Sequence, residues 1–303
     1  MTGGTEIRAG SHGFRLNRPE KVLFPDDGFT KRDVVEYYRA VAPRIVPQLR
    51  GRPLMMLRHP DGIERPGVVQ KNVPDHFPDW IRRERLPKEG GSVLHPVCDD
   101  TATLLYLAGQ ACLTPHRWLA RADHPDHPDR LVFDLDPSGG TGFADVRWAA
   151  RRVCALLEEE LRLPVALMTT GSSGLHVVVP LDGRTPFDEV RGFAGDAARL
   201  LVARHPERLT VEPRKADRGR RTYLDVQRNA YAQTAVTPYA LRALPGAPVA
   251  MPLWRGELDG PDLDPRGWTL TSAPDRARED PWAGMPRGRA LGPARRRLAT
   301  VEE

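Results

Sequence analysis

The sequence has 303 residues, of which 40% are hydrophobic and 28% charged, and its formal net charge is +5. These are the values of a globular protein with one large domain or two ordinary ones, and they exclude a disordered chain. No apolar run approaches the roughly 20 residues that cross a bilayer, and the first residues lack a signal pattern, so we expect a soluble cytoplasmic protein.

The excess of positive charge favours a polyanionic partner, although an arginine-rich proteome gives a similar excess by default. The three cysteines include no C-x-x-C pair, so reduced thiols are expected. Four residues could be considered as zinc ligands, namely His95, Cys98, Cys112 and His116, but their spacing matches no ordinary zinc module. We therefore expect neither disulfides nor zinc.

In the first part of the chain, residues 1–16 show no hydrophobic periodicity, and we expect them to form a flexible arm. Behind a plausible N-cap at Thr30, apolar residues recur at helical spacing. Two β-rich runs flank a Pro-Asp-Gly turn at 60–62, which is typical of a hairpin. The predicted elements are a helix at 31–48, strands at 53–57 and 67–70, a helix at 101–113 and a loop at 117–130.

The second part alternates strands and helices and ends in an arginine-rich stretch with few large apolar residues. This order predicts an α+β fold, with a sheet layer covered by helices. The tail is expected to be disordered. The predicted elements are strands at 130–136, 165–170, 175–181 and 222–227, and helices at 144–162 and 187–204.

Asp134 and Asp136 are the most informative residues, because alternation along a strand places both carboxylates on one face. At about 4 Å and a dielectric of about 20, two such charges repel by roughly 4 kcal/mol, so the pair favours a counter-cation. Oxygen ligands suit Mg²⁺ or Mn²⁺. The alternative is that Asp-x-Asp-Pro only ends a strand, with Pro137 forcing a turn.

A third acid, Asp225, lies within another apolar, strand-like run. An unpaired carboxylate there would be costly without a partner, which favours a place beside the first two acids. A structural salt bridge to Arg228 or Arg221 explains Asp225 equally well. Spacing alone does not separate the two interpretations.

Residues 168–177 form a glycine- and hydroxyl-rich turn between two predicted strands. Small residues let backbone N–H groups approach an anion, and His176 begins the following strand beside them. The segment could therefore hold phosphates. It could equally be an ordinary β-hairpin turn with a strand histidine.

Three motifs occur in one order: Asp134-Leu135-Asp136-Pro137, Ser173-Gly174-Leu175-His176 and Asp225-Val226-Gln227-Arg228-Asn229. This order resembles the polymerase domain of bacterial ligase D, a member of the archaeo-eukaryotic primase superfamily. Similar stretches occur at 18–25, 52–54, 70–72, 128–133, 252–254 and 280–282, so the resemblance covers about residues 16–284.

The resemblance implies a fold and a domain organisation. The fold is an α+β primase-type palm, with a central mixed or antiparallel sheet flanked by helices and a smaller N-terminal subdomain. The primase-polymerase domain is expected at 17–284. It would lie between a flexible N-terminal arm at 1–16 and a disordered, arginine-rich tail at 285–303.

The resemblance also implies roles for individual residues. Metal ligation and catalysis would fall to Asp134, Asp136 and Asp225. The incoming nucleotide would be bound by His116, Thr170, Ser172, His176, Arg228 and Arg242. The 5′-phosphate of a DNA end would be bound by Lys21, Lys31 and Arg58. Without the resemblance, His116 would be read as a loop histidine and Arg242 as a solvated surface charge.

The implied function is DNA-end-directed addition of nucleotides to 3′ ends, with ribonucleotides preferred, and filling of short gaps during bacterial non-homologous end joining. The cofactors would be two divalent ions, Mn²⁺ or Mg²⁺, and the substrates nucleoside triphosphates, NTP or dNTP. The partners would be gapped or overhanging DNA ends with a 5′-phosphate, together with Ku and a separate DNA ligase. The protein would be cytoplasmic and nucleoid-associated, with no membrane.

Several departures from the family pattern leave other functions open. Met168 and Ser173 stand where the family usually has lysines, and Val68 and Val69 stand where it often has an aromatic pair. A catalytically decayed module that binds and bridges 5′-phosphorylated DNA ends is the main alternative, and a metal-dependent phosphodiesterase is a third. Residues 215–218 superficially resemble a ligase K-x-D-G motif but lack its glycine, so a ligase is rejected.

Overall fold

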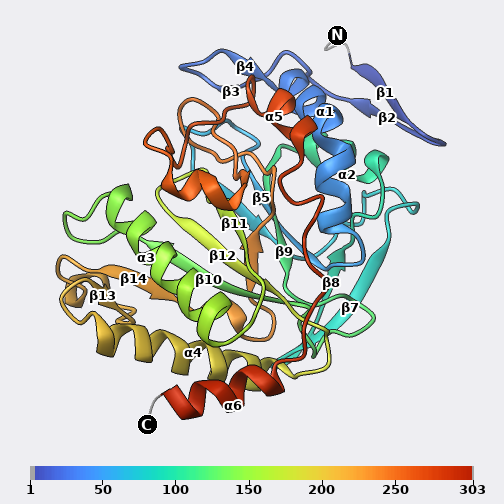
Figure 1. Cartoon of the computed structure of the whole chain (residues 1–303). Helices are drawn as coiled ribbons and strands as arrows, with labels where there is room; N and C mark the ends of the chain where they lie inside the picture. The colour runs from blue at the N-terminus through green and yellow to red at the C-terminus, as the bar shows by residue number, and fades with distance from the viewer. Residues whose placement is uncertain (1–3, 302–303) are drawn as a thin grey trace. The chain divides into compact units, whose positions relative to one another are not determined.

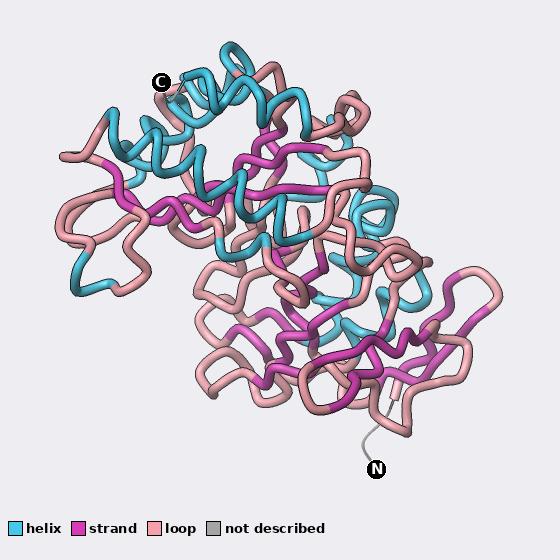
Figure 2. Tube along the Cα trace, turned by 90° about the horizontal axis from the view of Figure 1, so that it is seen from below, coloured by secondary structure: helices cyan, strands magenta, loops and turns pink. Residues whose placement is uncertain are grey.

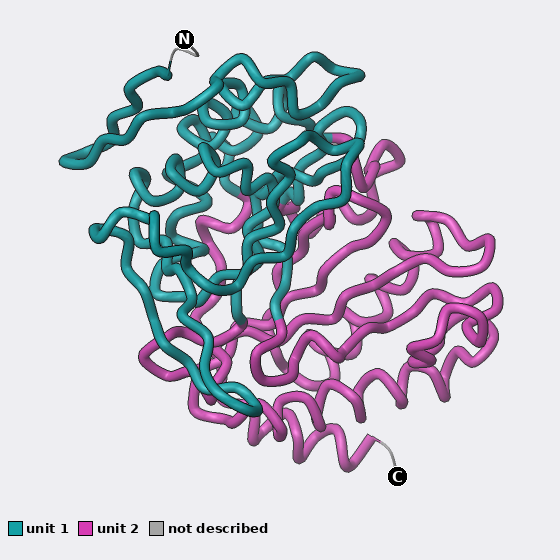
Figure 3. The backbone as a smooth tube through the Cα atoms, turned by 180° about the vertical axis from the view of Figure 1, so that it is seen from behind, with its two compact units in different colours: residues 1–118, 234–251, 268–280 teal, residues 119–233, 252–267, 281–303 magenta. Residues whose placement is uncertain are grey.

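The computed structural model describes residues 4–301, and the chain forms two compact units (Figure 3). Each unit is assembled from three separate stretches of chain. Unit 1 comprises Met1–Trp118, Thr234–Met251 and Trp268–Asp280. Unit 2 comprises Leu119–Gln233, Pro252–Gly267 and Pro281–Glu303. In residues 4–301, no helix combines the length and the apolar character that a membrane span requires.

Unit 1 contains a four-stranded sheet in the order β15-β9-β5-β6 and three two-stranded pairs, β1-β2, β3-β4 and β7-β8. Its strands are β1 (Thr5–Ala9), β2 (His12–Leu16), β3 (Val22–Phe24), β4 (Phe29–Thr30), β5 (Leu54–Arg58), β6 (Val68–Gln70), β7 (Arg83–Lys88), β8 (Gly91–Pro96), β9 (Cys112–Trp118) and β15 (Thr234–Val236). Its helices are α1 (Lys31–Leu49), α2 (Thr101–Gly109) and α5 (Ala273–Glu279).

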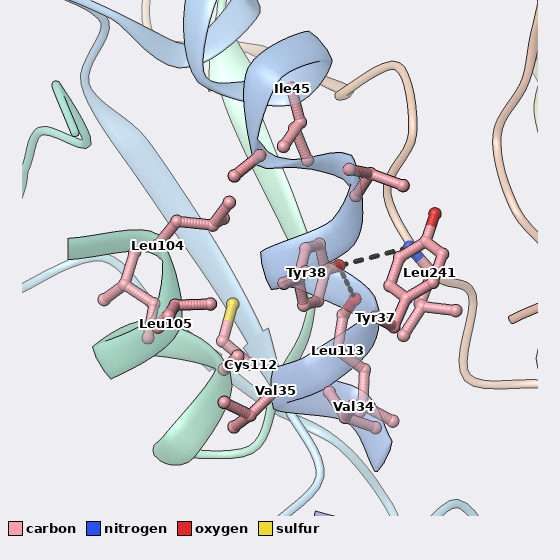
Figure 4. Packing of buried hydrophobic residues seen from close by; sticks show 14 of the residues in the cluster. Val34, Val35, Tyr37, Tyr38, Ile45, Leu104, Leu105, Cys112, Leu113 and Leu241 are labelled. Carbon is pink, nitrogen blue, oxygen red and sulfur yellow. Dashed lines mark hydrogen bonds between the residues drawn. The ribbon is translucent and has the colours of Figure 1, made fainter. Parts of the chain in front are cut away.

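Helix α1 organises the core of unit 1 (Figure 4). Thr30 and Asp33 form a capping box, in which the Asp33 carboxylate accepts from the Thr30 N–H at 2.7 Å. The apolar face of the helix is buried against α2. The Tyr38 hydroxyl donates to the Leu113 carbonyl at 2.5 Å and accepts from the Leu241 N–H at 3.2 Å. This phenol therefore ties the helix to two distant chain segments.

Unit 2 is built on a six-stranded sheet in the order β13-β14-β10-β12-β11-β16 (Figure 1). All its strand pairs are antiparallel except β13–β14. The strands are β10 (Arg130–Asp136), β11 (Ala166–Thr169), β12 (Leu175–Pro180), β13 (Leu209–Thr210), β14 (Thr222–Asp225) and β16 (Pro252–Leu253). The longer helices are α3 (Phe143–Ala155), α4 (Phe187–Arg204) and α6 (Gly292–Val301). Short helical turns are η1 (Leu156–Glu160), η2 (Lys215–Asp217), η3 (Gln227–Asn229) and η4 (Arg255–Asp259).

Helices α3 and α4 both contact β10, and Figure 2 shows helices laid along the strands of this unit. Phe133 and Leu135 are completely buried. Because side chains alternate across a strand, these two residues lie on the face opposite to Asp134 and Asp136. The C-terminal end of β10 thus carries core residues on one face and two carboxylates on the other.

The predicted α+β class is confirmed, and several predicted elements recur with nearly the expected bounds. The helix predicted at 31–48 is α1, the helix at 187–204 is α4, and the strand at 130–136 is β10. The predicted hairpin is also present, since β5 and β6 pair antiparallel. The predicted helix at 101–113 was too long, because Ala111 adopts a left-handed φ of 58° and strand β9 begins at Cys112.

Both chain ends differ from the sequence-based expectation. The arm predicted at 1–16 contains the hairpin β1-β2, whose Ile7 and Leu16 are buried in the core of unit 1. The tail predicted to be disordered at 285–303 contains α6, which contacts α4 and buries Ala294 and Leu298. Two apolar residues four apart are enough to give this basic helix a buried stripe. Residues 1–3 and 302–303 of those predictions lie outside the described residues.

Candidate functional site

Three carboxylates predicted from separate motifs lie on adjacent strands of unit 2. Asp134 on β10 stands directly opposite Asp225 on β14 in the antiparallel register. Directly opposed residues in a sheet project from the same face, and Asp136 shares that face with Asp134 by alternation. The structure therefore brings Asp134, Asp136 and Asp225 together.

His176 extends this row on the other side of β10. It stands opposite Asp134 in the pairing of β10 with β12, and its Nε2 lies 3.2 Å from Asp134 Oδ1. Both side chains are buried. An imidazole protonated at Nε2 donates to this carboxylate, which fixes the orientation of both groups.

Arg228 approaches the same carboxylates from the turn η3 after β14. Its Nε lies 3.5 Å from Asp134 Oδ2 and 3.8 Å from Asp225 Oδ2, and its side chain is 44% exposed. The salt bridge between Asp225 and Arg228 that spacing left open is therefore formed. Arg221 instead donates to backbone carbonyls of Arg218 and Asp217. The ion pair and the carboxylate cluster coexist.

Burial and mutual repulsion raise the pKa of both Asp136 and Asp225. Burial, then the charge of Asp134, raises the pKa of Asp136 to about 6. Burial also raises the pKa of Asp225, although the Gln227 N–H, which donates to its Oδ1 at 2.8 Å, opposes the shift. A nearby cation would relieve both penalties.

The donor set of the cluster fits a divalent cation, because its carboxylate oxygens are hard ligands. Within residues 4–301, no group of three His, Cys, Asp or Glu side chains is already arranged around a metal position. The two oxygens of Asp134 face His176 and Arg228 instead. Ligation by all three acids would therefore require side-chain rotation.

Asn229 is a functional candidate that the sequence did not single out. Its Nδ2 donates to the Val132 carbonyl at 2.7 Å, and its Oδ1 accepts from the Val132 N–H at 2.8 Å. The side chain is completely buried. Asn229 therefore fixes η3, which carries Arg228, to the middle of β10. The only signal in the sequence was the position of Asn229 at the end of the third motif, which begins at Asp225.

Tyr223 is a second residue of this kind. It stands opposite Asp136 in the register, and its hydroxyl hydrogen-bonds the Asp225 carboxylate. The Arg218 guanidinium lies 3.7 Å from the centre of its ring. Burial raises the pKa of Tyr223 to about 12. Alternation from Asp225 would have placed Tyr223 on the acidic face.

The hydroxyl-rich segment is a β-hairpin turn between β11 and β12, and it lies beside the acids. Thr170 Oγ1 and Ser172 Oγ are 2.9 Å apart, and the Thr170 hydroxyl also accepts from the Gly174 N–H at 3.1 Å. A Cβ at Gly174 would lie 2.5 Å from the Leu135 carbonyl oxygen and 3.0 Å from Asp136 Oδ1. Glycine therefore lets the turn approach β10 closely.

Unit 1 holds a basic pocket of about 200 Å³ that two of the three predicted 5′-phosphate residues line. Lys31 and Arg58 line it, and Lys31 Nζ donates to the Asn17 carbonyl at 3.1 Å. Lys21 is ion-paired with Asp61 at 2.6 Å. Burial, then the charges of Arg18, Lys21 and Arg58, lowers the pKa of Lys31. A cluster of positive charges of this kind would favour a bound anion. Arg15, Asn17 and Arg18 also line the pocket, and the sequence did not single them out.

The two remaining predicted nucleotide contacts also lie in unit 1. His116 is on β9, opposite Met55 on β5. Arg242 follows β15, and its N–H donates to the Pro248 carbonyl at 2.7 Å. The Thr114 hydroxyl donates to the Leu241 carbonyl at 2.6 Å, which brings the two segments alongside each other. Thr170, Ser172, His176 and Arg228 lie in unit 2.

Comparison with known proteins places this architecture in a class. Over 88% of the chain, the fold superposes on the polymerase domain of Mycobacterium tuberculosis ligase D in complex with DNA, with a TM-score of 0.83, 31% identity and 94% of that chain covered. The fold is therefore a primase-type palm.

Sequence comparison identifies the family. Residues 30–282 match the family described as LigD, primase-polymerase domain. Multifunctional non-homologous end joining protein LigD of Mycolicibacterium smegmatis is 32% identical over 82% of this chain and 33% of the relative. Its counterpart in Pseudomonas aeruginosa is 31% identical over 91% of this chain and 33% of the relative. This chain belongs to the LigD primase-polymerase family and spans about a third of the length of these relatives.

Proposed function

We propose that this chain is a DNA-end-directed primase-polymerase that adds nucleotides, preferably ribonucleotides, to 3′ ends and fills short gaps during bacterial non-homologous end joining. The observation that carries the proposal is the convergence of Asp134, Asp136 and Asp225 on one face of the sheet. Family membership and the DNA complex of a relative support it. The proposed functional span is 17–284.

The proposed reaction is attack of a primer 3′-hydroxyl on the α-phosphate of a nucleoside triphosphate, which forms a phosphodiester bond, breaks the bond between the α- and β-phosphates and releases pyrophosphate. Two divalent ions, Mg²⁺ or Mn²⁺, would supply activation of the hydroxyl and stabilisation of the charge on the transferred phosphate. Asp136 and Asp225 would hold the ion beside the hydroxyl. Asp134 and Asp136 would hold the ion beside the triphosphate.

The β12 side of the cluster suits the triphosphate. The hydroxyls of Thr170 and Ser172 lie next to each other there, and His176 contacts Asp134. On the β14 side, Arg228 is half-exposed, and its positive charge lies beside Asp134 and Asp225. We assign these four residues to triphosphate binding, together with His116 and Arg242 of unit 1.

The basic pocket of unit 1 is proposed to bind the 5′-phosphate of the DNA end. Lysine is a compact point charge that pairs well with a terminal phosphate, and Arg58 adds a guanidinium to Lys21 and Lys31. Such a pocket would direct the polymerase to broken or gapped DNA, on which Ku and a separate ligase would also act.

Primer extension on a 5′-phosphorylated gap tests the proposal. Asp134→Ala should abolish incorporation of a labelled triphosphate with Mn²⁺ while DNA affinity stays close to that of the wild type. An unchanged incorporation rate would remove the catalytic assignment. Running ribo- and deoxyribonucleotides in parallel tests the sugar preference.

A second candidate function is a decayed module that binds and bridges 5′-phosphorylated ends. The exposure of Val68 and Val69, 49% and 60%, favours it, because these side chains offer no aromatic ring on which a base could stack. Met168 is buried and provides no charge for a triphosphate. If the wild-type chain retains phosphorylated ends but adds no nucleotide, this second function is correct. Loss of nucleotides from the primer would instead indicate a phosphodiesterase.

A further inference from the structure

The hydroxyl-rich turn between β11 and β12 contains no positive charge of its own, because residues 168–177 include no lysine or arginine. A cation that binds the triphosphate at this turn must therefore come from another segment of the chain. Arg266, in the segment that follows η4, contacts the turn. Its Nε donates to the Ser172 carbonyl at 2.9 Å. Both residues belong to unit 2.

The turn continues the face of the sheet that carries the acids. Met168 stands opposite His176, and His176 stands opposite Asp134, so the three side chains project from one face. The pairing continues beyond β11, because the Thr170 N–H donates to the Gly174 carbonyl at 3.1 Å. By alternation, Thr170 therefore follows Met168 on the acidic face.

Gly174 lies between the acids and the hydroxyls of the turn. A Cβ at Gly174 would lie 3.0 Å from Asp136 Oδ1, so this position borders the carboxylate cluster. On the other side, Thr170 Oγ1 lies 2.9 Å from Ser172 Oγ. Neighbouring strands are about 4.8 Å apart, so the path from Asp136 past Gly174 to Thr170 crosses two strand spacings, roughly 10 Å. Because glycine has no side chain, a chain of phosphates could follow this path.

Arg266 lies at the far end of this path. Its Nε is bonded to the carbonyl of Ser172, and the hydroxyl of the same serine faces Thr170. Bond lengths keep the carbonyl oxygen and the hydroxyl oxygen of one serine within about 5 Å of each other. The guanidinium is therefore within reach of a phosphate that is bound at the two hydroxyls.

The charge of Arg266 is not neutralised by an ion pair. Its Nη1 and Nη2 make no hydrogen bond or salt bridge with other residues of the described range 4–301. Asp264 is the nearest acid along the chain, and its Oδ1 accepts from the Arg266 backbone N–H at 2.7 Å instead of from the guanidinium. The Arg266 side chain is exposed. A guanidinium that presents two unbonded nitrogens is well suited to bidentate contact with a phosphate.

Arg228 and Arg266 lie at opposite sides of the carboxylate cluster. Arg228 contacts Asp134 and Asp225, on the β14 side. The strand order β14-β10-β12-β11 separates this side from the turn that Arg266 contacts. With the α-phosphate at the metal-binding acids, Arg228 lies close to the reacting phosphate. Arg266 lies at the end of the path where the last phosphate would be.

We propose that Arg266 binds the γ-phosphate of the incoming nucleotide and thereby makes the site prefer nucleoside triphosphates to diphosphates. The assignment rests on the proposed polymerase function for the identity of the ligand. Binding of the nucleotide can nevertheless be measured without primer and without turnover, so the contact and the reaction are tested separately.

The test measures binding of a fluorescent ribonucleoside triphosphate, and of the corresponding diphosphate, to the full chain with Mn²⁺. The variant is Arg266→Gln. The control is Arg255→Gln, which removes an arginine of the same chain segment. Leu253 pairs with Leu167, so Arg255 lies toward the start of β11, away from the turn, and it is paired with Glu158. Melting curves check that all proteins are folded.

We expect Arg266→Gln to raise the Kd for the triphosphate about tenfold, the usual effect of losing a hydrogen bond between charged groups. The Kd for the diphosphate should not change, and Arg255→Gln should behave like the wild type with both ligands. An unchanged Kd for the triphosphate would overturn the assignment. An equal rise for both ligands would also overturn it, because Arg266 would then act only by supporting the turn.

Primer extension separates this inference from the proposed function. If the wild type prefers the triphosphate through Arg266 but extends no primer, the polymerase function fails and the Arg266 contact stands. If the wild type extends primers and Arg266→Gln keeps the full preference for the triphosphate, the contact fails and the polymerase function stands.

Discussion

The Asn229 side chain pairs with the backbone of Val132 in both directions, donating to its carbonyl and accepting from its N–H. These two hydrogen bonds replace those that a neighbouring strand would make with the centre of β10. They are needed there because β14 pairs with β10 only at residues 134–136 and then continues into η3. The position of Arg228, one residue earlier, follows from them. The geometry of the acidic cluster thus depends on an uncharged residue.

Asn229→Ala should lower the free energy of unfolding by about 2 to 4 kcal/mol, because it leaves two buried peptide groups of Val132 without partners. Urea denaturation measures the change. Asn72→Ala is the matched control, since Asn72 is exposed and its side chain accepts a hydrogen bond from the Leu94 N–H. Similar losses in the two variants would contradict the role given to Asn229. Incorporation should also fall in Asn229→Ala, because Arg228 and Asp225 lose their support.

Gly174→Ala should reduce both stability and nucleotide incorporation. The new methyl group would clash with the Leu135 carbonyl oxygen and Asp136 Oδ1, so the turn would have to move away from β10. We expect a loss of about 1 to 3 kcal/mol, the usual range for overpacking. Gly256→Ala is the control, because a Cβ there meets nothing within 4 Å. If Gly174→Ala changed neither the stability nor the incorporation rate, the turn would not be held against the acids.

The pKa of Asp136 predicts a pH dependence of stability in protein treated with a chelator. Its folded-state pKa of about 6 exceeds the unfolded value near 3.8, so between these pH values the folded protein binds the extra proton. Stability should therefore fall as pH rises from about 4 to 6. Asp136→Asn removes this penalty and should be more stable than the wild type by about 1 to 3 kcal/mol at pH 8, but not at pH 3.

Thermal or urea unfolding across this pH range checks the prediction. Asp259→Asn gives a contrast of opposite sign, because the hydrogen bond from Arg151 lowers the pKa of Asp259, which is exposed. That variant should gain nothing at pH 8. If Asp136→Asn is destabilised at pH 8, Asp136 makes a favourable ionic contact that outweighs its burial.

Lys31→Met should remove the preference for 5′-phosphorylated DNA ends. The methionine fills similar space but carries no charge, and it also relieves the repulsion of Lys31 by Arg18, Lys21 and Arg58. The ratio of Kd values for ends with and without a 5′-phosphate should fall to about 1, while stability does not decrease. Lys88→Met is the control, because Lys88 lies exposed at the end of β7. An unchanged ratio would place the phosphate elsewhere.

Strong periodicity made some elements predictable from the sequence. Helices α1 and α4 bury regular apolar stripes, and β10 alternates between core and acidic side chains, so the local pattern and the fold agree. Strand β9 was missed because Leu104–Leu113 is an almost continuous apolar run, buried on all sides, in which helix and strand have no distinguishable period.

The hairpin β7-β8 was missed for the opposite reason. Four of the six residues of β7 are charged, and Leu86 is the one buried residue of that strand, so its sequence carries no alternating apolar face. In the site, alternation could place Asp134 and Asp136 on one face. It could not place Asp225 or His176, because their positions depend on strand order and register, which tertiary packing decides.

The chain passes five times between the two units before it ends, since each unit is assembled from three separated stretches. Any C-terminal truncation that begins before Asp280 therefore removes residues from both units, and one that begins at Ala273 also removes α5, which packs on α1. C-terminal truncations cannot isolate end recognition from chemistry in this protein. The two activities have to be separated by single substitutions, and limited proteolysis should yield no stable fragment that corresponds to either unit alone.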